Sequence, residues 1–238
     1  MILRGTVRAD RPLVVLAVEE EARYLPPELP VLLTGMGKVN AASAVAAVLA
    51  AGPRPALLLN LGTAGALRPG WTGIHEVATV LQHDLDTALL RTLTGQTYGA
   101  PLPLATQGAV LATGDTFVAD DAARDRLAQR ADLVDMEGYA IAWAASQAGV
   151  PCRLVKQVSD EAGEGAARSW RESVDACARD LAEWAGRHLD WRSRSLAAPP
   201  QSQARRGLPG MAGDQDVTGQ PERHDGAHQH RRPAAGPR

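Results

Sequence analysis

Cysteine, lysine and aromatic residues are scarce in this chain of 238 residues. The two cysteines, Cys152 and Cys177, show neither metal-ligand spacing nor a disulfide framework, so we expect a reducing compartment, no metal and no cofactor. With one Phe and three Tyr, the core must consist mainly of Leu, Val and Ala. The apolar run at residues 13–18 is too short to cross a membrane and leads directly into three glutamates. These absences predict a cytoplasmic protein with no membrane partner.

Charge is divided unevenly along the chain. The only lysines are Lys38 and Lys156, so Arg supplies nearly all of the positive charge. Residues 191–238 carry eight Arg, four acidic residues, six Pro and six Gly without a periodic apolar face, and we expect them to form a disordered tail. The remaining 17 basic and 23 acidic residues give residues 1–190 a net negative charge, which argues against nucleic acid as a partner.

Apolar runs alternate with helical patterns through residues 1–190, a length that suits one domain. Runs typical of strands lie at 12–18, 29–33, 56–61, 73–81, 108–113, 133–135 and 152–158, and helical patterns at 38–51, 120–131, 137–150 and 169–189. The alternation predicts an α/β fold, namely a single three-layer α/β/α domain with a central mixed, mostly parallel twisted sheet. Residues 87–106 are polar and poorly patterned. An apolar stripe in the last helix is assigned to core packing: Trp170, Val174, Cys177, Leu181 and Trp184.

Carboxylates lie at the strand ends of residues 133–160. Asp135 and Glu137 lie where a short strand passes into a helix, and taken alone they are best interpreted as a capping pair. Asp160 follows a mostly apolar run, and the next helical pattern starts only near Ser169, which weakens a capping interpretation. Partial desolvation at such a strand end raises the affinity of a carboxylate for a proton, and this suits Asp160 to general-acid catalysis.

Three other stretches are candidate binding elements. The turn that contains Gly35 and Gly37 allows close approach of the backbone to a ligand, although such a turn is a weak signal. Thr63 lies among small residues that leave room for a ligand. Phe117 is either a core residue beside a turn or an aromatic ring that meets a flat heterocycle. One of the three glutamates at residues 19–21 is expected to point inward from the strand end.

The order of the motifs resembles the nucleoside phosphorylase and nucleosidase superfamily, and most of all the bacterial 5′-methylthioadenosine/S-adenosylhomocysteine nucleosidases. Six blocks carry the resemblance: residues 19–21, 35–42, 60–65, 113–117, 135–138 and 159–160. They follow the family order within residues 13–160 and exclude the tail. The resemblance implies an N-glycosyl hydrolase of methionine salvage, which releases adenine from a purine nucleoside, uses water as nucleophile and forms a homodimer.

The resemblance also implies roles for individual residues. Glu21 resembles the base that polarises the attacking water, and Asp160 the acid that hydrogen-bonds the purine N7. The implied substrate-binding residues are Ser159, which supports the acid; Thr63, which replaces the usual serine of its turn; Phe117, which stacks on adenine; Val118, whose backbone reads the adenine edge; Met136, under the sugar; Glu137, on the ribose hydroxyls; and Trp170, near the ribose and its 5′ substituent. Departure of a purine develops opposite charges on sugar and base, so acids at these two ends stabilise one transition state.

Three functions remain open at the level of sequence. The first is a nucleosidase that acts on 5′-methylthioadenosine/S-adenosylhomocysteine or on a futalosine-type nucleoside. The second is a purine nucleoside phosphorylase, a transferase that needs several Arg and Gly donors for phosphate; Arg23 is the only nearby candidate, so hydrolysis is favoured. The third is a non-catalytic nucleoside binder, against which the joint presence of Glu21, Glu137 and Asp160 argues.

Overall fold

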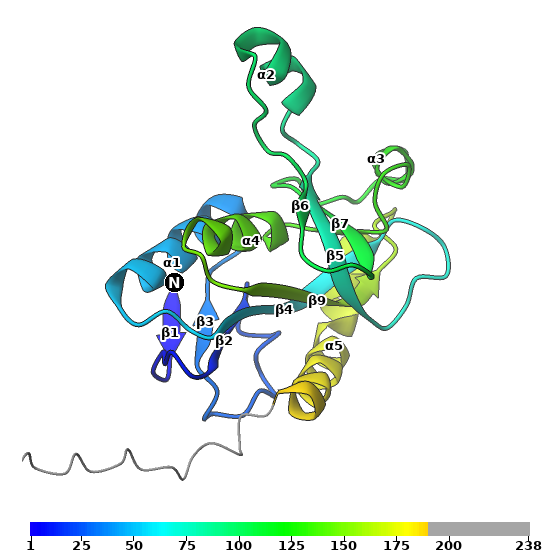
Figure 1. Cartoon of the computed structure of the whole chain (residues 1–238). Helices are drawn as coiled ribbons and strands as arrows, with labels where there is room; N and C mark the ends of the chain where they lie inside the picture. The colour runs from blue at the N-terminus through cyan, green and yellow to red at the C-terminus, as the bar shows by residue number, and fades with distance from the viewer. Residues whose placement is uncertain (190–238) are drawn as a thin grey trace, which may run out of the picture. The chain divides into compact units, whose positions relative to one another are not determined.

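A computed structural model describes residues 1–189, so the tail predicted at 191–238 lies outside the described residues. Nine strands and five helices make up this part of the chain (Figure 1). In chain order they are β1 (Ile2–Arg4), β2 (Pro12–Leu16), β3 (Val31–Leu33), α1 (Lys38–Ala51), β4 (Leu57–Ala66), β5 (Ile74–Gln82), α2 (Thr87–Thr94), β6 (Leu102–Pro103), β7 (Ala109–Thr113), α3 (Asp121–Leu127), β8 (Leu133–Asp135), α4 (Gly138–Gln147), β9 (Cys152–Asp160) and α5 (Ala166–His188).

The nine strands form one mixed sheet with the order β1-β3-β2-β4-β8-β7-β5-β6, and β9 pairs with both β4 and β5. Five strand pairs are parallel and four are antiparallel. Because β9 joins β4 to β5, the strands β4, β8, β7, β5 and β9 close into a ring. Strands β2, β3 and β1 extend from β4 at one edge of this ring.

Helices cover both faces of the extended part of the sheet, which explains why its strands are continuous apolar runs. Leu13 and Val15 of β2 pack with α1 and α4, whereas Val14 and Leu16 pack with α5. This alternation follows from the two-residue period of a strand. Figure 1 shows α1 and α4 together on one side of the sheet and α5 on the other. None of the helices within residues 1–189 is long and apolar enough to cross a membrane.

Helix α2 lies in the section that sequence patterns left without a prediction, at the end of an arm that leads away from the sheet (Figure 1). None of its residues is buried, so packing within the described chain does not stabilise it. Instead, its ends are capped: the Asp86 side chain accepts a hydrogen bond from the Leu89 N–H, and Gly95 adopts the left-handed conformation. Leu89 and Leu93 are exposed one turn apart on its surface.

Helix α5 departs from its prediction at the N-terminus. It begins at Ala166, three residues before the predicted start at Ser169. Val174, Cys177, Leu181 and Trp184 are buried as core residues, as the stripe predicts. Trp170 is only half-buried and lines a cavity, so its assignment to the core was wrong. The first turns of α5 therefore extend beyond the core to the edge of the sheet.

Gly108, which precedes β7, gives a test of the fold. Its φ of +140° is unfavourable for other residues, and a Cβ there would lie 2.5 Å from the backbone oxygen of Glu76. We expect Gly108→Ala to lower the free energy of unfolding by about 2–4 kcal/mol. Glu76 belongs to β5, and neither β5 nor β7 can move away from the added Cβ without loss of the pairing between them. Urea denaturation measures this change. Gly52→Ala is the control, since a Cβ at Gly52 meets open space; equal stability of both variants would contradict the prediction.

Candidate active site

The register of neighbouring strands assembles one site from distant parts of the chain. Gly65 in β4 pairs with Val134 in β8 on one side and with Asp160 in β9 on the other. On the next strand, Thr113 of β7 pairs with Asp135 of β8. The carboxyl ends of β7, β8 and β9 therefore converge beside the C-terminal half of β4. Strand ends at such a place are where α/β proteins bind ligands.

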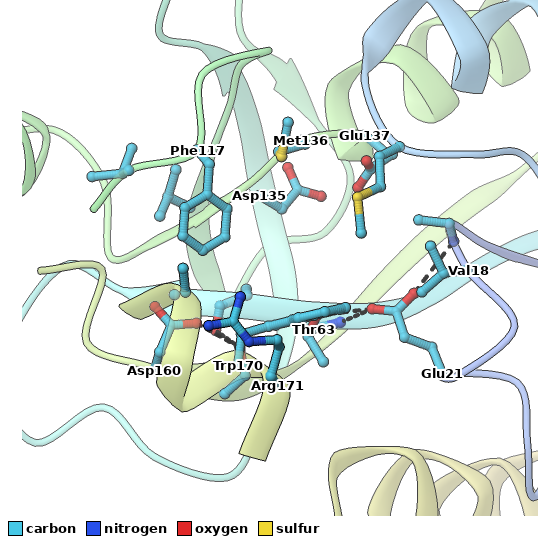
Figure 2. A pocket seen from close by; sticks show the side chains of 18 of the residues that line it. Val18, Glu21, Thr63, Phe117, Asp135, Met136, Glu137, Asp160, Trp170 and Arg171 are labelled. Atoms are coloured by element: carbon cyan, nitrogen blue, oxygen red, sulfur yellow. Dashed lines mark hydrogen bonds between the residues drawn. The ribbon is translucent and has the colours of Figure 1, made fainter. Parts of the chain in front are cut away.

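A cavity of about 250 Å³ opens at this place (Figure 2). All nine residues for which the sequence predicted a site role line it: Glu21, Thr63, Phe117, Val118, Met136, Glu137, Ser159, Asp160 and Trp170. Asp160 and Glu21 lie toward opposite ends of the lining, with Thr63 and Trp170 between them (Figure 2). Three further residues with long or charged side chains line the cavity, and the sequence predicted no role in binding or catalysis for them: Met36, Asp135 and Arg171.

Glu21 is the inward-pointing member of the three glutamates and is 4% exposed, whereas Glu19 and Glu20 are exposed. Its Oε1 accepts hydrogen bonds from the backbone N–H and the hydroxyl of Thr63, both at 2.8 Å. Its Oε2 accepts a longer one, 3.3 Å, from the Ala17 N–H. The Thr63 hydroxyl in turn accepts from the Trp170 indole N–H at 2.9 Å. A chain of hydrogen bonds therefore links α5 to Glu21.

Lys156 of β9 is the largest fully buried side chain of the described core, and its ammonium pairs with Asp135 at 2.9 Å. Burial lowers its pKa, but the charges of Asp135 and Glu137 more than offset this, so the pKa lies above its ordinary 10.5. A Cβ on Gly62 would lie 3.2 Å from this ammonium and 3.4 Å from Glu21 Oε1. The absence of a side chain at Gly62 therefore allows Lys156 and Glu21 to approach each other.

Asp135 and Glu137 have different roles in the structure. Asp135 accepts hydrogen bonds from the Gly138 N–H at 2.8 Å and the Thr113 hydroxyl at 2.6 Å, so it caps α4 as well as pairing with Lys156. Glu137 makes no capping hydrogen bond and instead accepts from the Gly37 N–H at 2.7 Å. Burial, and next the charge of Asp135, raise the pKa of Glu137 to about 8. The capping interpretation thus holds for Asp135 alone.

Asp160 lies outside this cluster of charges and is 9% exposed. It accepts hydrogen bonds from the Ser159 hydroxyl at 2.8 Å and from the Ala162 N–H at 2.9 Å. Burial nevertheless raises its pKa above the ordinary 3.8, because these two hydrogen bonds only partly offset the loss of hydration. Asp160 therefore retains a proton at a higher pH than an exposed aspartate does.

Phe117 is 43% exposed at the mouth of the cavity, so it is not the core residue that one interpretation proposed. Its ring and the side chains of Val118 and Met136 offer apolar surface to a flat heterocycle. Arg23, the sequence candidate for a phosphate ligand, does not line the cavity. It pairs with Asp175 of α5 at 2.6 Å. Within residues 1–189, no group of three or more His, Cys, Asp or Glu side chains is arranged to hold a metal ion.

Known relatives share both the sequence pattern and the fold. The family model of the phosphorylase superfamily matches residues 74–190. The chain is 32% identical over 183 residues to the 5′-methylthioadenosine/S-adenosylhomocysteine nucleosidase of Geobacillus kaustophilus. This alignment covers 66% of this chain and 77% of the relative. The enzyme of the same name from Geobacillus thermodenitrificans is 30% identical over 208 residues, with 76% and 88% covered. The aminodeoxyfutalosine nucleosidase of Campylobacter jejuni is 29% identical over 176 residues, with 64% and 76% covered.

Two solved structures illustrate the shared fold. The futalosine hydrolase of Helicobacter pylori superimposes with a TM-score of 0.64 at 19% identity and covers 75% of this chain and 96% of that structure. The 5′-methylthioadenosine/S-adenosylhomocysteine nucleosidase of S. pneumoniae gives a TM-score of 0.62 at 24% identity, with 73% and 95% covered. The chain belongs to the phosphorylase superfamily and has an α/β nucleoside phosphorylase-like fold. With nucleosidases as its relatives, it is an N-glycosyl hydrolase that cleaves purine nucleosides.

The raised pKa of Glu137 makes the stability of the protein depend on pH. The folded protein holds this proton up to about pH 8, whereas the unfolded chain releases it near the ordinary value of 4.5. Stability associated with protonated Glu137 is therefore fully present below pH 4.5 and is lost as pH rises through about 8. We expect Glu137→Gln to gain stability relative to the wild type over this window, by about 2–5 kcal/mol in total.

Urea unfolding at pH 5, 7 and 9 measures this difference between Glu137→Gln and the wild type. The control is Glu20→Gln, which removes the carboxylate of an exposed neighbour of Glu21. A stability difference for Glu137→Gln that stays constant from pH 5 to pH 9 would contradict the assignment of a protonated Glu137.

Proposed function

We propose that this enzyme hydrolyses the N-glycosidic bond of a 5′-substituted adenosine, in the manner of the 5′-methylthioadenosine/S-adenosylhomocysteine nucleosidases. The observation that carries the proposal is the separation of two kinds of carboxyl group along one cavity. Asp160, whose pKa burial raises, lies toward one end, and Glu21 with its hydrogen bonds to Thr63 lies toward the other. An acid and a base in different environments are what glycoside hydrolysis requires.

In this mechanism the adenine ring lies against Phe117, with its N7 toward Asp160. Asp160 donates a hydrogen bond or a proton to N7, so that the electron pair of the breaking bond moves into the base. Positive charge develops on the ribose, near Glu21 and Glu137. Water attacks C1′, and Glu21 accepts its proton. Because Oε1 of Glu21 already accepts two hydrogen bonds from Thr63, Oε2 is the oxygen with capacity for water.

Hydrolysis is favoured over phosphorolysis by the groups that surround the proposed ribose site. A phosphate nucleophile needs several cationic or N–H donors. Arg23 is committed to Asp175, and the ammonium of Lys156 pairs with Asp135 beside Glu21 and Glu137. The carboxylate of Glu21 repels a phosphate dianion. Water carries no charge and avoids this repulsion.

Release of adenine from 5′-methylthioadenosine, with and without phosphate, tests the proposal. We expect adenine and free sugar at the same rate in both buffers. Asp160→Asn should lower kcat by at least about a hundredfold while nucleoside binding is largely retained, because an amide makes hydrogen bonds but transfers no proton. Asp175→Asn, on the outer surface of α5, is the control. Release only with phosphate, or an Asp160→Asn variant with the wild-type rate, would overturn the proposal.

A futalosine-type nucleoside is the second candidate substrate. Its support is the Campylobacter jejuni relative, whose name states this activity, at an identity close to that of the Geobacillus enzymes. The same assay with aminodeoxyfutalosine separates the candidates. Activity on 5′-methylthioadenosine or S-adenosylhomocysteine would place the enzyme in methionine salvage in the cytoplasm.

We also infer that residues 1–190 form the whole catalytic domain, a three-layer α/β/α unit in which two helical layers enclose the sheet.

We further propose that the enzyme is a homodimer with α2 in its interface. The support is the exposure of Leu89 (51%) and Leu93 (69%) on a helix that buries none of its own residues. Apolar side chains presented on such an arm indicate a protein partner, here a second copy.

Light scattering after size exclusion tests the dimer. The wild type should have twice the chain mass of 25.1 kDa, and the double variant Leu89→Glu/Leu93→Glu should be a monomer, because charge opposes burial of this face. Arg91→Glu, on the other side of α2, is the control for adding an acid. A wild-type monomer, or a double variant that remains dimeric, would exclude this interface.

A further inference from the structure

Among the described residues that line the cavity, Arg171 is the one cation, and no step of the proposed hydrolysis uses it. It lies in the second turn of α5, directly after Trp170, whose indole N–H is held by Thr63. Arg171 is exposed, yet its side chain is one of those that line the cavity (Figure 2). It therefore lies at the opening, between the interior of the site and solvent.

Within residues 1–189, Arg171 has no hydrogen-bond or ion-pair partner, because the nearby carboxylates are already engaged. On its own helix, Glu172 pairs with Arg168 at 2.8 Å. Asp175, four residues on, accepts from Arg23, Tyr24 and Arg179. On the cavity wall, the carboxylates are satisfied by other donors: Glu21 by Thr63, Glu137 by Gly37, Asp135 by Lys156, and Asp160 by Ser159 and Ala162. The guanidinium of Arg171 is thus available to a ligand.

The part of a ligand that reaches Arg171 is set by the rest of the site. This argument rests on the proposed function. With the base against Phe117 and Asp160 and the ribose near Glu21 and Glu137, the 5′ substituent is the part left to extend through the opening. An anion deeper in the site would meet the carboxylates of Glu21 and Asp135, whereas an anion at the opening meets Arg171. A guanidinium binds a carboxylate in a bidentate, charge-assisted manner.

We propose that Arg171 binds a carboxylate carried on the 5′ substituent of the nucleoside, and that the enzyme prefers such substrates to those with a short neutral substituent. The inner carboxylates and Arg171 act together in this selection. They favour a molecule whose negative charge lies far from the ribose. The same arrangement orients the substituent outward, with its charged end in partial contact with solvent.

The experiment compares two adenosines under identical conditions. One is 5′-methylthioadenosine, with a neutral substituent, and the other is 5′-(2-carboxyethylthio)adenosine, which carries a carboxylate and no ammonium group. The measured quantity is the ratio of kcat/KM for the carboxylate compound to that for the neutral compound, from adenine release. We expect Arg171→Met to lower this ratio about three- to tenfold, mainly through KM, and Arg171→Lys to lower it less. Added salt should lower the wild-type ratio.

Arg168→Met is the matched control, since it removes an Arg one turn away on the same helix that does not line the cavity. Its ratio should equal that of the wild type. A ratio that Arg171→Met leaves unchanged, or lowers no more than Arg168→Met does, would overturn the proposal while the hydrolase activity stands. Adenine release that depends on phosphate in the wild type and is lost in Arg171→Met would overturn it too, because Arg171 would then bind the nucleophile. If the wild type releases adenine from neither compound, the proposed function itself fails and this proposal with it.

Discussion

The buried ion pair between Lys156 and Asp135 is the interaction on which the site depends. Four carboxylates line a cavity of about 250 Å³, and each is at least nine-tenths buried. Removing that many acids from water is costly unless positive charge accompanies them. Lys156 is fully buried among them and is held at 2.9 Å from Asp135. Breaking a pair of this kind leaves an uncompensated charge, which typically costs about 3–5 kcal/mol.

One ammonium does not neutralise every carboxylate near it, so the carboxyl groups of the cavity lie in different electrostatic environments. Asp135 has the direct contact with Lys156 and additional donors in Thr113 and Gly138. Glu137, with one backbone donor and the charge of Asp135 beside it, has its pKa raised to about 8. Asp160 lies apart from the cluster, and burial alone raises its pKa. The buried cation in the middle of β9 thus distinguishes Asp135 from Glu137, and Asp160, which lies outside the cluster, is a third kind of carboxyl group in the same cavity.

The positions of the acidic residues could be predicted from the sequence because each follows an apolar run. The ends of strands in an α/β fold meet, so Glu21, Glu137 and Asp160 could be grouped without coordinates. Lys156 left a visible signal, a lysine inside an apolar strand, but its partner depends on the register of β8 and β9 around the ring. That register is a non-local property, which local periodicity does not contain. Arg171 was missed for a related reason, since an Arg beside an apolar stripe is the normal pattern of a solvent-facing helix position.

Sequence patterns also failed at α2, and the physical reason is the same. A helix that packs against its own domain shows a periodic apolar face, whereas α2 buries nothing in the described chain. Its signals in the sequence were Leu89 and Leu93 at helical spacing, too few for a clear pattern, and the caps, Asp86 before the helix and Gly95 after it, which are short and common. Cap residues define where a helix can begin and end, but they acquire meaning only when a pattern between them supports a helix.

The link between Trp170, Thr63 and Glu21 shows how a residue of the helical layer can act on a carboxylate of the sheet. The Trp170 N–H occupies an acceptor position of the Thr63 hydroxyl, so the single hydroxyl proton is directed to Glu21 Oε1. With the Thr63 N–H on the same oxygen, Oε1 is saturated, while Oε2 has only the 3.3 Å contact from Ala17. The two oxygens of one carboxylate are thereby made unequal. A threonine bonded only to Glu21 would be free to rotate its proton elsewhere, so the position of α5 determines which oxygen of Glu21 faces the ligand with unused acceptor capacity.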